Sequence, residues 1–526
     1  MTARAAPGRL IAAFATVGAW TMASRVLGFA RDVAIAAILG AGAVAEAFFV
    51  AFTLPNLFRR FFAEGAFNTA FVPMFAKRVE AVGPDGARAF AEQALSCLAT
   101  ILIVLTLVAQ LAMPWLVWGL ASGLDPERSA LAADFGRIVF PYILLISMAA
   151  LLSGVLNSLD RFWAAAAAPV LLNVILLGAL ALGWLGALPT SGSAIPGFDY
   201  GTALSWGVIV AGIAQAGFVW FAARRAGLTL MPRLPRFTPE MRRLAIIAAP
   251  AALAGGVMQV NLVIGRQVAS YFEGAVGWLW YADRVYQLPL GVIGVAIGVV
   301  LLPTLARHVR SGDGAAGRAA VNRAAEFALT LTLPATAALL AMPWLVVSVL
   351  FERGAFGPGD TDATALALAI YALGLPAFVL QKVLQPVFFA REDTRSPLRY
   401  AAWSMLANLV VAGLGAAVIG WVAAAAGATV AAWLNLALLW RGARATDPDL
   451  AVDARLSRRL PRIGLASLVM ALLVAGLASF GAGLDPLARA ALLAVTVVAG
   501  LGLFGAAGLG LGAFTLADLK GGLRRG

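Results

Sequence analysis

The sequence predicts an all-α polytopic membrane protein with fourteen transmembrane helices. Of its 526 residues, 62% are hydrophobic and only 12% are charged, whereas soluble domains average about 45–50% apolar and about 25% charged residues. The mean hydropathy is +0.89, and a helix needs roughly 20 apolar residues to cross a bilayer. The predicted spans are 10–38, 45–76, 91–118, 138–160, 164–186, 201–222, 244–271, 277–305, 324–350, 363–390, 399–419, 421–440, 463–481 and 488–518.

The basic residues support this number of spans. Lys and Arg are enriched in the cytoplasmic connections of membrane proteins. With the N-terminus in the cytoplasm, the termini and the even-numbered connections contain 28 of the 39 Lys and Arg residues, when Arg399 at the first position of span 399–419 is counted with its connection. The odd-numbered connections contain Arg128, Arg137, Arg353 and Arg489. A miscounted span would destroy this alternation, so both termini are expected in the cytoplasm.

A weak internal repeat indicates how the spans are organised. Phe71-Val-Pro-Met-Phe-Ala-Lys-Arg78 closes the second span, and Leu301-Leu-Pro-Thr-Leu-Ala-Arg-His308 closes the eighth. Many transporters are built from duplicated halves related by an axis along the membrane normal. We therefore expect a six-helix lobe at residues 1–226, a pseudo-symmetric six-helix lobe at 227–442, and two further helices at 443–526.

Residue counts exclude several classes of protein. The single cysteine, Cys97, has no partner for a disulfide, and the single histidine, His308, excludes a His-rich metal centre. None of the three lysines precedes Ser or Thr, so the chain has no ATP-binding Walker A loop. No connection exceeds about two dozen residues. We therefore expect a transporter and not an enzyme, and we attribute the net charge of +13 to topology instead of nucleic-acid binding.

Basic residues inside the predicted spans are the strongest functional signal. A charged side chain at the centre of a helix costs about 2.5–3.5 kcal/mol on insertion scales, so it persists only when paired, hydrated or functional. One interpretation is structural ion pairing, of Arg60 with Glu64 four residues later, or of Arg25 with Asp32 on the same helix face. The intramembrane basic residues are Arg25, Arg31, Arg59, Arg60, Arg266, Arg284 and Lys382.

The other interpretation is a cationic cavity. The nearby carboxylates are too few to neutralise the cluster of Arg25, Arg31, Arg59 and Arg60 in the first two spans. An arginine-lined cavity selects anions, and the planar guanidinium matches phosphate oxygens in a bidentate manner. A cation antiporter would need spare carboxylates instead.

Six segments of the chain carry a resemblance to a known family. They are Ser24-Arg-Val-Leu-Gly-Phe-Ala-Arg-Asp32, Leu54-Pro-Asn-Leu-Phe-Arg-Arg-Phe-Phe-Ala-Glu-Gly-Ala-Phe67, Phe140-Pro-Tyr-Ile-Leu-Leu-Ile-Ser147, Trp280-Tyr-Ala-Asp-Arg284, Leu301-Leu-Pro303 and Phe351-Glu-Arg-Gly-Ala-Phe356. In this order they resemble the MurJ (MviN-type) lipid II flippases of the multidrug/oligosaccharidyl-lipid/polysaccharide (MOP) exporter superfamily. The resemblance covers about residues 10–440. It implies a flippase that moves undecaprenyl-diphosphate-linked disaccharide-pentapeptide from the inner to the outer leaflet of the bacterial plasma membrane.

The resemblance also implies a central cavity, a lipid-tail groove on the last two helices, and a set of site residues. It gives the diphosphate-binding role to Arg25, Arg31, Arg59 and Arg284. It gives supporting roles to Asp32, Asn56, Arg60, Glu64, Asp283 and Gln287. Gln287 departs from the family, because many relatives have an acidic residue there. No metal or cofactor is expected.

Lipid II and membrane lipids are the expected partners, with cell-wall synthesis proteins as further candidates, and the chain is expected to act as a monomer. Alternating access would expose the site to each side of the membrane in turn. The alternatives are a flippase for another polyprenyl-diphosphate glycan, a cation-coupled drug antiporter of the same superfamily, and a non-transporting scaffold for cell-wall assembly.

Overall fold

The computed structural model describes residues 7–59, 66–188, 199–231, 233–236, 238–311 and 313–515. Throughout these ranges the chain is built from α-helices and short connections, without a β-strand. Among the described residues, ten helices are long and apolar enough to cross a membrane. The prediction of an all-α, multi-pass membrane protein is therefore confirmed.

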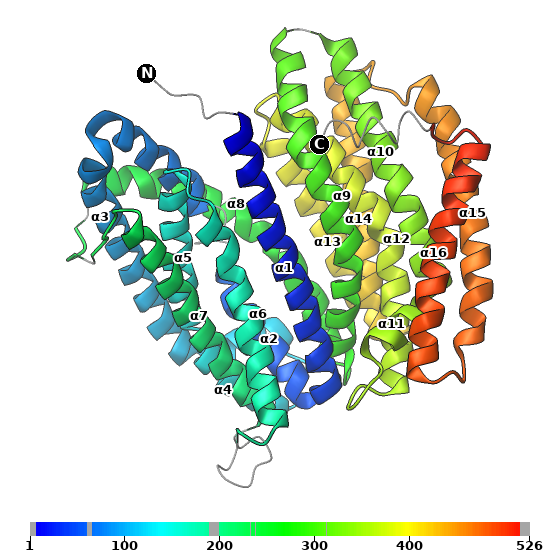
Figure 1. Cartoon of the computed structure of the whole chain (residues 1–526), viewed down its shortest axis with the longest axis horizontal. Helices are drawn as coiled ribbons and strands as arrows, with labels where there is room; N and C mark the ends of the chain where they lie inside the picture. The colour runs from blue at the N-terminus through cyan, green and yellow to red at the C-terminus, as the bar shows by residue number, and fades with distance from the viewer. Residues whose placement is uncertain are drawn as a thin grey trace. The chain divides into compact units, whose positions relative to one another are not determined.

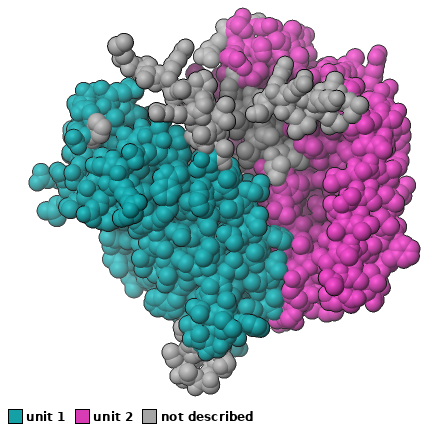
Figure 2. Space-filling view, viewed as in Figure 1, with its two compact units in different colours: residues 1–263 teal, residues 264–526 magenta. Residues whose placement is uncertain are grey.

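The chain divides into two compact units, residues 1–263 and 264–526 (Figure 2). α8 (Pro239–Ala269) crosses this division. Unit 1 contains α1 (Pro7–Leu39), α2 (Ala43–Arg59), α3 (Ala66–Ala121), α4 (Pro126–Val139), α5 (Tyr142–Asn157), α6 (Trp163–Trp184) and α7 (Tyr200–Arg225). Unit 2 contains α9 (Ala275–Ser311), α10 (Gly314–Ala341), α11 (Pro343–Phe351), α12 (Pro358–Phe389), α13 (Arg395–Ile419), α14 (Val422–Thr446), α15 (Ala454–Ala478) and α16 (Pro486–Gly510).

Within unit 1, two helices carry the segments that resemble the flippase family. α1 packs mainly against α6, and α2 packs against α4, α5 and α7. The core of α2 is an apolar run from Ala45 to Leu54 in which Phe48, Phe49 and Val50 are almost fully buried. Burial of such side chains contributes about 1.5–3 kcal/mol each in water, and close packing takes over this role in lipid.

Within unit 2, α12 is the central helix and contacts α9, α10, α11 and α14. α13 packs on α14, while α15 packs on α10 and pairs with α16 (Figure 1). Small residues allow close contacts: a Cβ added to Gly427 of α14 would come within 2.5 Å of Asn408 Oδ1 on α13. The helix pair α15–α16 therefore forms an outer edge of this unit, in orange and red in Figure 1.

Three predicted spans differ in their boundaries from the observed helices. Span 45–76 comprises α2 and the start of α3, with residues 60–65 between them outside the described part of the chain. Span 138–160 covers the end of α4 and all of α5, and span 324–350 covers most of α10 and of α11. Proline explains two of these breaks, because Pro141 and Pro343 have no backbone N–H to continue the preceding helix. Both prolines lie inside predicted spans, Pro141 in 138–160 and Pro343 in 324–350.

Gly83 interrupts the long helix α3. Its backbone has φ 75° and ψ 172°, which is not a helical conformation. Only glycine adopts this region at little cost. The part of α3 that is apolar enough to cross a membrane begins just beyond it, at Asp85.

Aspartates begin several helices by accepting a hydrogen bond from a backbone N–H of the first turn, which Asp favours at this position. Each of them immediately precedes a helix. They are Asp125 before α4, Asp199 before α7, Asp313 before α10, Asp453 before α15 and Asp485 before α16.

The basic residues of the odd-numbered connections are bonded within the protein. Arg128 Nη1 lies 2.7 Å from buried Glu46, and Arg489 Nη1 lies 2.8 Å from Glu352. Arg137 is paired with Asp134, and Arg353 donates to the carbonyl of Val349. Three of these four arginines, Arg128, Arg137 and Arg489, are therefore paired with a carboxylate.

Candidate functional site

Arg31 and Asp32 form a buried ion pair on α1. The Arg31 side chain donates to Asp32 Oδ1 from Nε at 3.1 Å and from Nη2 at 2.8 Å. The two residues are only 6% and 2% exposed. Burying either charge alone would be strongly unfavourable, so each residue makes the burial of the other tolerable. For Arg31, the structure shows the structural pairing that the sequence left open as one interpretation.

Asn173 of α6 completes this cluster and was not identified from the sequence. Its Oδ1 accepts a hydrogen bond from Arg31 Nη1 at 3.0 Å, and its Nδ2 donates to the carbonyl of Ser24 at 2.9 Å. α1 and α6 approach closely here, because a Cβ added to Gly28 would lie 3.4 Å from Asn173. Asn173 could have been recognised from the sequence as a candidate polar contact, because it is the one amide side chain in the otherwise apolar span 164–186.

Arg25 differs from Arg31 in its surroundings. It is exposed on α1 and makes no hydrogen bond or ion pair with any residue that the structure describes. The sequence suggested Asp32 as its partner, but Asp32 accepts two bonds from Arg31. Within unit 1, Arg25 is thus an exposed member of the predicted set.

Arg59 and Asn56 lie near the end of α2, and both are half-buried. Asn56 Nδ2 donates to the carbonyl of Phe52 at 2.7 Å. That bond lies next to Pro55, which cannot donate to the helix ladder. Arg60 and Glu64, the proposed i,i+4 pair, lie outside the described residues.

Arg284 of α9 lies over the ring of Trp280, with Cζ 4.4 Å from the ring centroid. A second arginine, Arg266 at the end of α8, contacts the same ring at 5.3 Å. Two cations on one indole are attracted to its electron-rich faces, a contact worth about 0.5–2 kcal/mol for each cation. Arg266 was counted among the intramembrane basic residues but received no role from the sequence.

Asp283 is bonded to Gln287 one turn later on α9. Gln287 Nε2 donates to Asp283 Oδ2. The residue that departs from the family pattern therefore gives a carboxylate a hydrogen-bond partner on its own helix. An acidic residue at position 287 would place two like charges at i,i+4 instead.

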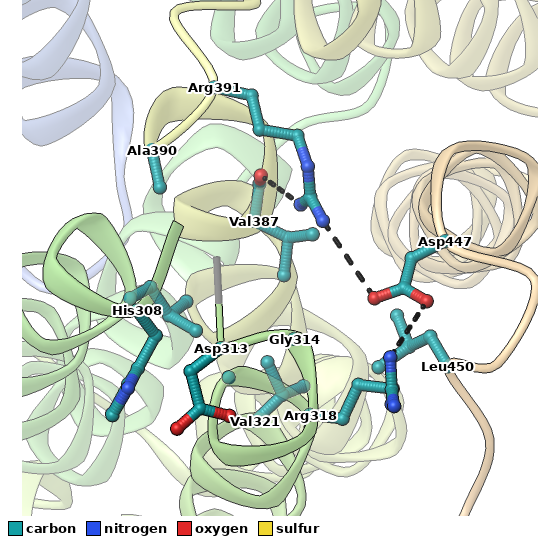
Figure 3. A pocket seen from close by; sticks show the side chains of 12 residues that line it. His308, Asp313, Gly314, Arg318, Val321, Val387, Ala390, Arg391, Asp447 and Leu450 are labelled. Atoms are coloured by element: carbon teal, nitrogen blue, oxygen red, sulfur yellow. Dashed lines mark hydrogen bonds and ion pairs between the residues drawn. The ribbon is translucent and has the colours of Figure 1, made fainter. Parts of the chain in front are cut away.

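A cavity of about 240 Å³ lies near the ends of α9, α12 and α14 and the start of α10 (Figure 3). Arg318 and Arg391 point toward Asp447 from opposite sides, at 3.4 Å and 3.8 Å. The half-buried His308 also lines it. His308 lies 24 residues from Arg284 along α9, a separation of about 36 Å on a helix. The predicted site residues therefore do not line this cavity, whose charges compensate one another.

Residues 35–484 match the family described as lipid II flippase MurJ. The chain belongs to the MurJ family. The match includes Arg59, Arg284 and both halves of the predicted internal repeat, while Arg25, Arg31 and Asp32 lie before it.

Relatives in the MurJ family extend over most of the chain. A probable lipid II flippase MurJ of Rhizobium meliloti (strain 1021) is 48% identical over 473 residues, which is 88% of this chain and 85% of the relative. A lipid II flippase MurJ of Burkholderia cenocepacia is 34% identical, with 83% of this chain and 84% of the relative covered. These alignments confirm the resemblance predicted from the motifs.

Solved structures show the same fold. The structure titled "Lipid II flippase MurJ, inward closed conformation" superposes with a TM-score of 0.78 at 21% identity, covering 94% of this chain and 98% of the other. An inward-facing multidrug resistance MATE family transporter of the MOP superfamily has a TM-score of 0.68 at 14% identity, covering 81% of this chain and 95% of the other. The MurJ family chain therefore has a fold shared with MOP superfamily transporters.

Proposed function

We propose that this chain is a lipid II flippase, which moves the undecaprenyl-diphosphate-linked peptidoglycan precursor from the inner to the outer leaflet of the bacterial plasma membrane. Its membership of the MurJ family, with 48% identity to a probable lipid II flippase over 473 residues, carries this proposal. The proposed topology has fourteen transmembrane helices, arranged as two six-helix lobes and a final pair, with both termini in the cytoplasm.

Arginines would bind the diphosphate during transport. Arg25 supports this role because it is exposed, and Arg284 because it lies beside a second cation, Arg266, on the ring of Trp280. Guanidinium groups bind phosphate oxygens through charge-assisted hydrogen bonds. We assign Arg59 to the same set, and we propose Arg266 as an additional member in unit 2.

Arg31 would have a different role from the other three. Its guanidinium donates to Asp32 and to Asn173. A phosphate would have to replace the Asp32 carboxylate to bind it directly. We propose that Arg31 and Asp32 hold α1 in place beside α6, and that Arg25, two turns earlier on the same helix, contacts the substrate.

Transport of this substrate does not require ATP. Each negative charge that moves outward against an inside-negative potential gains about 2.3 kcal/mol per 100 mV. The diphosphate would therefore move down its electrical gradient through alternating access of the two lobes. The polar head would move through a hydrated path while the prenyl tail stays in lipid.

The proposed function can be tested in bacterial cells whose native lipid II flippase is depleted and which carry this chain instead. Cells carrying the wild-type chain should grow and should expose lipid II on the outer leaflet. Arg59→Ala, present at normal abundance, should support neither growth nor exposure of lipid II. Arg395→Ala provides the control, because Arg395 is an exposed residue at the start of α13 and should tolerate the change. Normal lipid II exposure with Arg59→Ala would contradict the role of this arginine, and lack of complementation by the wild-type chain would contradict the function.

A further inference from the structure

α15 has one buried face and one exposed face. It packs against α10 and α16. Its buried residues recur at helical spacing and are Leu456, Ile463, Ala466, Ser467, Met470 and Val474. The opposite face contacts no other helix extensively in the described part of unit 2, so it is the surface that this helix presents to the membrane.

Two of the four arginines in the first turns of α15 point toward α10. Arg455 and Arg459 both contact the carboxylate of Glu326, and Arg455 Nε lies 3.1 Å from Glu326 Oε2. Arg323 of α10 contacts the same carboxylate at 2.6 Å and also bonds Asp453. The carboxylates between α10 and α15 are thus already engaged by the inward-pointing arginines.

The other two arginines, Arg458 and Arg462, are exposed. Arg458 forms no hydrogen bond or ion pair with the residues that the structure describes. Arg462 Nη1 donates to the carbonyl of Gly512 at 3.3 Å, a bond that leaves its charge without a carboxylate. Because residues four apart lie one above the other on a helix, these two guanidinium groups form a single cationic patch.

An apolar stripe continues directly from this patch. Arg462, Leu465, Val469 and Leu472 follow Arg458 at i+4, i+7, i+11 and i+14, so all five residues lie on one face of α15. The three apolar side chains are 49%, 37% and 67% exposed. The stripe extends about 15 Å from Arg462 to Leu472, given the rise of a helix.

We propose that Arg458 and Arg462 bind the phosphate of an anionic phospholipid in the inner leaflet, while Leu465, Val469 and Leu472 contact its acyl chain. The basic distribution of the sequence places this end of α15 on the cytoplasmic side. Anionic lipid is abundant there, and basic residues at the membrane surface attract it. The site includes none of the arginines proposed to bind the diphosphate.

The combination of charge and apolar surface on one helix face favours a lipid over other anions. A soluble phosphate would contact only the two guanidinium groups. An acidic protein segment would leave the stripe unused, because the stripe lies at the depth of the acyl chains. A phospholipid uses both parts, and its phosphodiester lies at the level where the apolar stripe ends.

Native mass spectrometry of the purified full-length protein in detergent tests this site. The protein is mixed with dioleoylphosphatidylglycerol, with dioleoylphosphatidylcholine, or with inorganic phosphate, and the bound species are counted. The wild type should retain phosphatidylglycerol in preference to phosphatidylcholine. Arg458→Gln with Arg462→Gln should weaken phosphatidylglycerol binding by about fivefold for each arginine removed, since each basic residue near the surface contributes about that factor.

Two further variants make the result specific. Arg458→Lys with Arg462→Lys keeps both charges and should retain most of the binding, which separates charge from folding. Arg242→Gln with Arg243→Gln removes two exposed arginines from the start of α8 and should leave binding unchanged. Equal affinity of the wild type for the two lipids, or equal losses in both Gln pairs, would overturn the proposal. Displacement of phosphatidylglycerol by millimolar inorganic phosphate, or by undecaprenyl diphosphate at equal concentration, would overturn it in favour of that anion.

Discussion

Arg31 Nη2 lies 2.8 Å from Oδ1 of Asp32, although adjacent residues on a helix do not usually face each other. The long arginine side chain turns back along α1 to reach its neighbour, and its Nη1 bonds Asn173 of α6. A buried and nearly neutral pair therefore lies inside a segment where the sequence suggested free positive charge. Arg25 and Arg31, which look equivalent in the sequence, have different environments.

Asp32→Asn is expected to destabilise unit 1 strongly. The substitution leaves the buried Arg31 charge uncompensated, which costs about 3 kcal/mol or more of the free energy of unfolding. Denaturant titration of the purified protein measures this loss. Asp134→Asn is the control, since Asp134 pairs with Arg137 at an exposed position. That change should cost less than about 1 kcal/mol. Similar losses in the two variants would show that the Arg31–Asp32 pair is not buried in the native state.

Arg25→Gln and Arg31→Gln should separate function from stability. Arg25 is exposed without a described partner, so Arg25→Gln should leave the melting temperature unchanged. It should still lower lipid II flipping by about tenfold, the value of one charge-assisted hydrogen bond. Arg31→Gln should lower both, because it leaves Asp32 buried without its partner. Unchanged flipping in Arg25→Gln at normal protein level would remove Arg25 from the substrate site.

Trp280→Leu should weaken substrate binding through two arginines at once. The ring lies beneath both Arg284 and Arg266, at 4.4 and 5.3 Å. Loss of two cation–π contacts of about 0.5–2 kcal/mol each frees both side chains, and the expected fall in flipping is about tenfold. Trp403→Leu is the matched control, because Trp403 is exposed on α13 of the same unit. Flipping that falls equally in the two variants would indicate a general effect of losing an indole.

Asp453→Asn should make the stability of unit 2 less dependent on pH. Partial burial raises the pKa of the Asp453 carboxyl, but the backbone N–H of Leu456 and the guanidinium of Arg323 outweigh it and hold the pKa below the usual 3.8. A lowered pKa stabilises the folded state above 3.8 and loses that contribution as the pH falls through the folded value. Asn retains the helix-capping oxygen, so the substitution isolates the charge.

The melting temperatures of wild type and Asp453→Asn at pH 7, 5 and 3 check this prediction. The variant should melt at a lower temperature at pH 7 and pH 5, and the difference should shrink at pH 3. Asp449→Asn provides the comparison, since Asp449 is 81% exposed and lies 3.8 Å from Arg318. A constant difference across the three pH values would mean that the ion pair of Asp453 with Arg323 does not contribute.

Much of the fold was predictable from composition, because only long apolar helices satisfy the backbone in lipid. The helix ends at Pro141 and Pro343 were predictable in principle. They were missed because the residues on both sides of each proline are apolar, so each segment resembled one continuous span. The non-helical Gly83 lies in the connection between the predicted spans 45–76 and 91–118, and the dipeptide Gly83-Pro84 is typical of a chain break.

The sequence identified candidate site residues by their type, but it did not identify the residues to which they are bonded. The intramembrane arginines were identified because their insertion cost requires a reason. Their partners could not be assigned from spacing alone. Arg31 pairs with its neighbour Asp32, which the sequence had assigned to Arg25, and it also bonds Asn173, 142 residues away. The contact of the Trp280 ring with two guanidinium groups is visible only in the structure.

The contact of Asn173 with α1 has a mechanical consequence. Asn173 of α6 bonds both Ser24 and Arg31 and lies against Gly28. This one side chain therefore contacts α1 at three residues within two helical turns. We therefore expect the segment of α1 from Ser24 to Arg31 to move together with α6. Spin labels on the two helices close to Asn173 test this expectation, because their separation should stay constant.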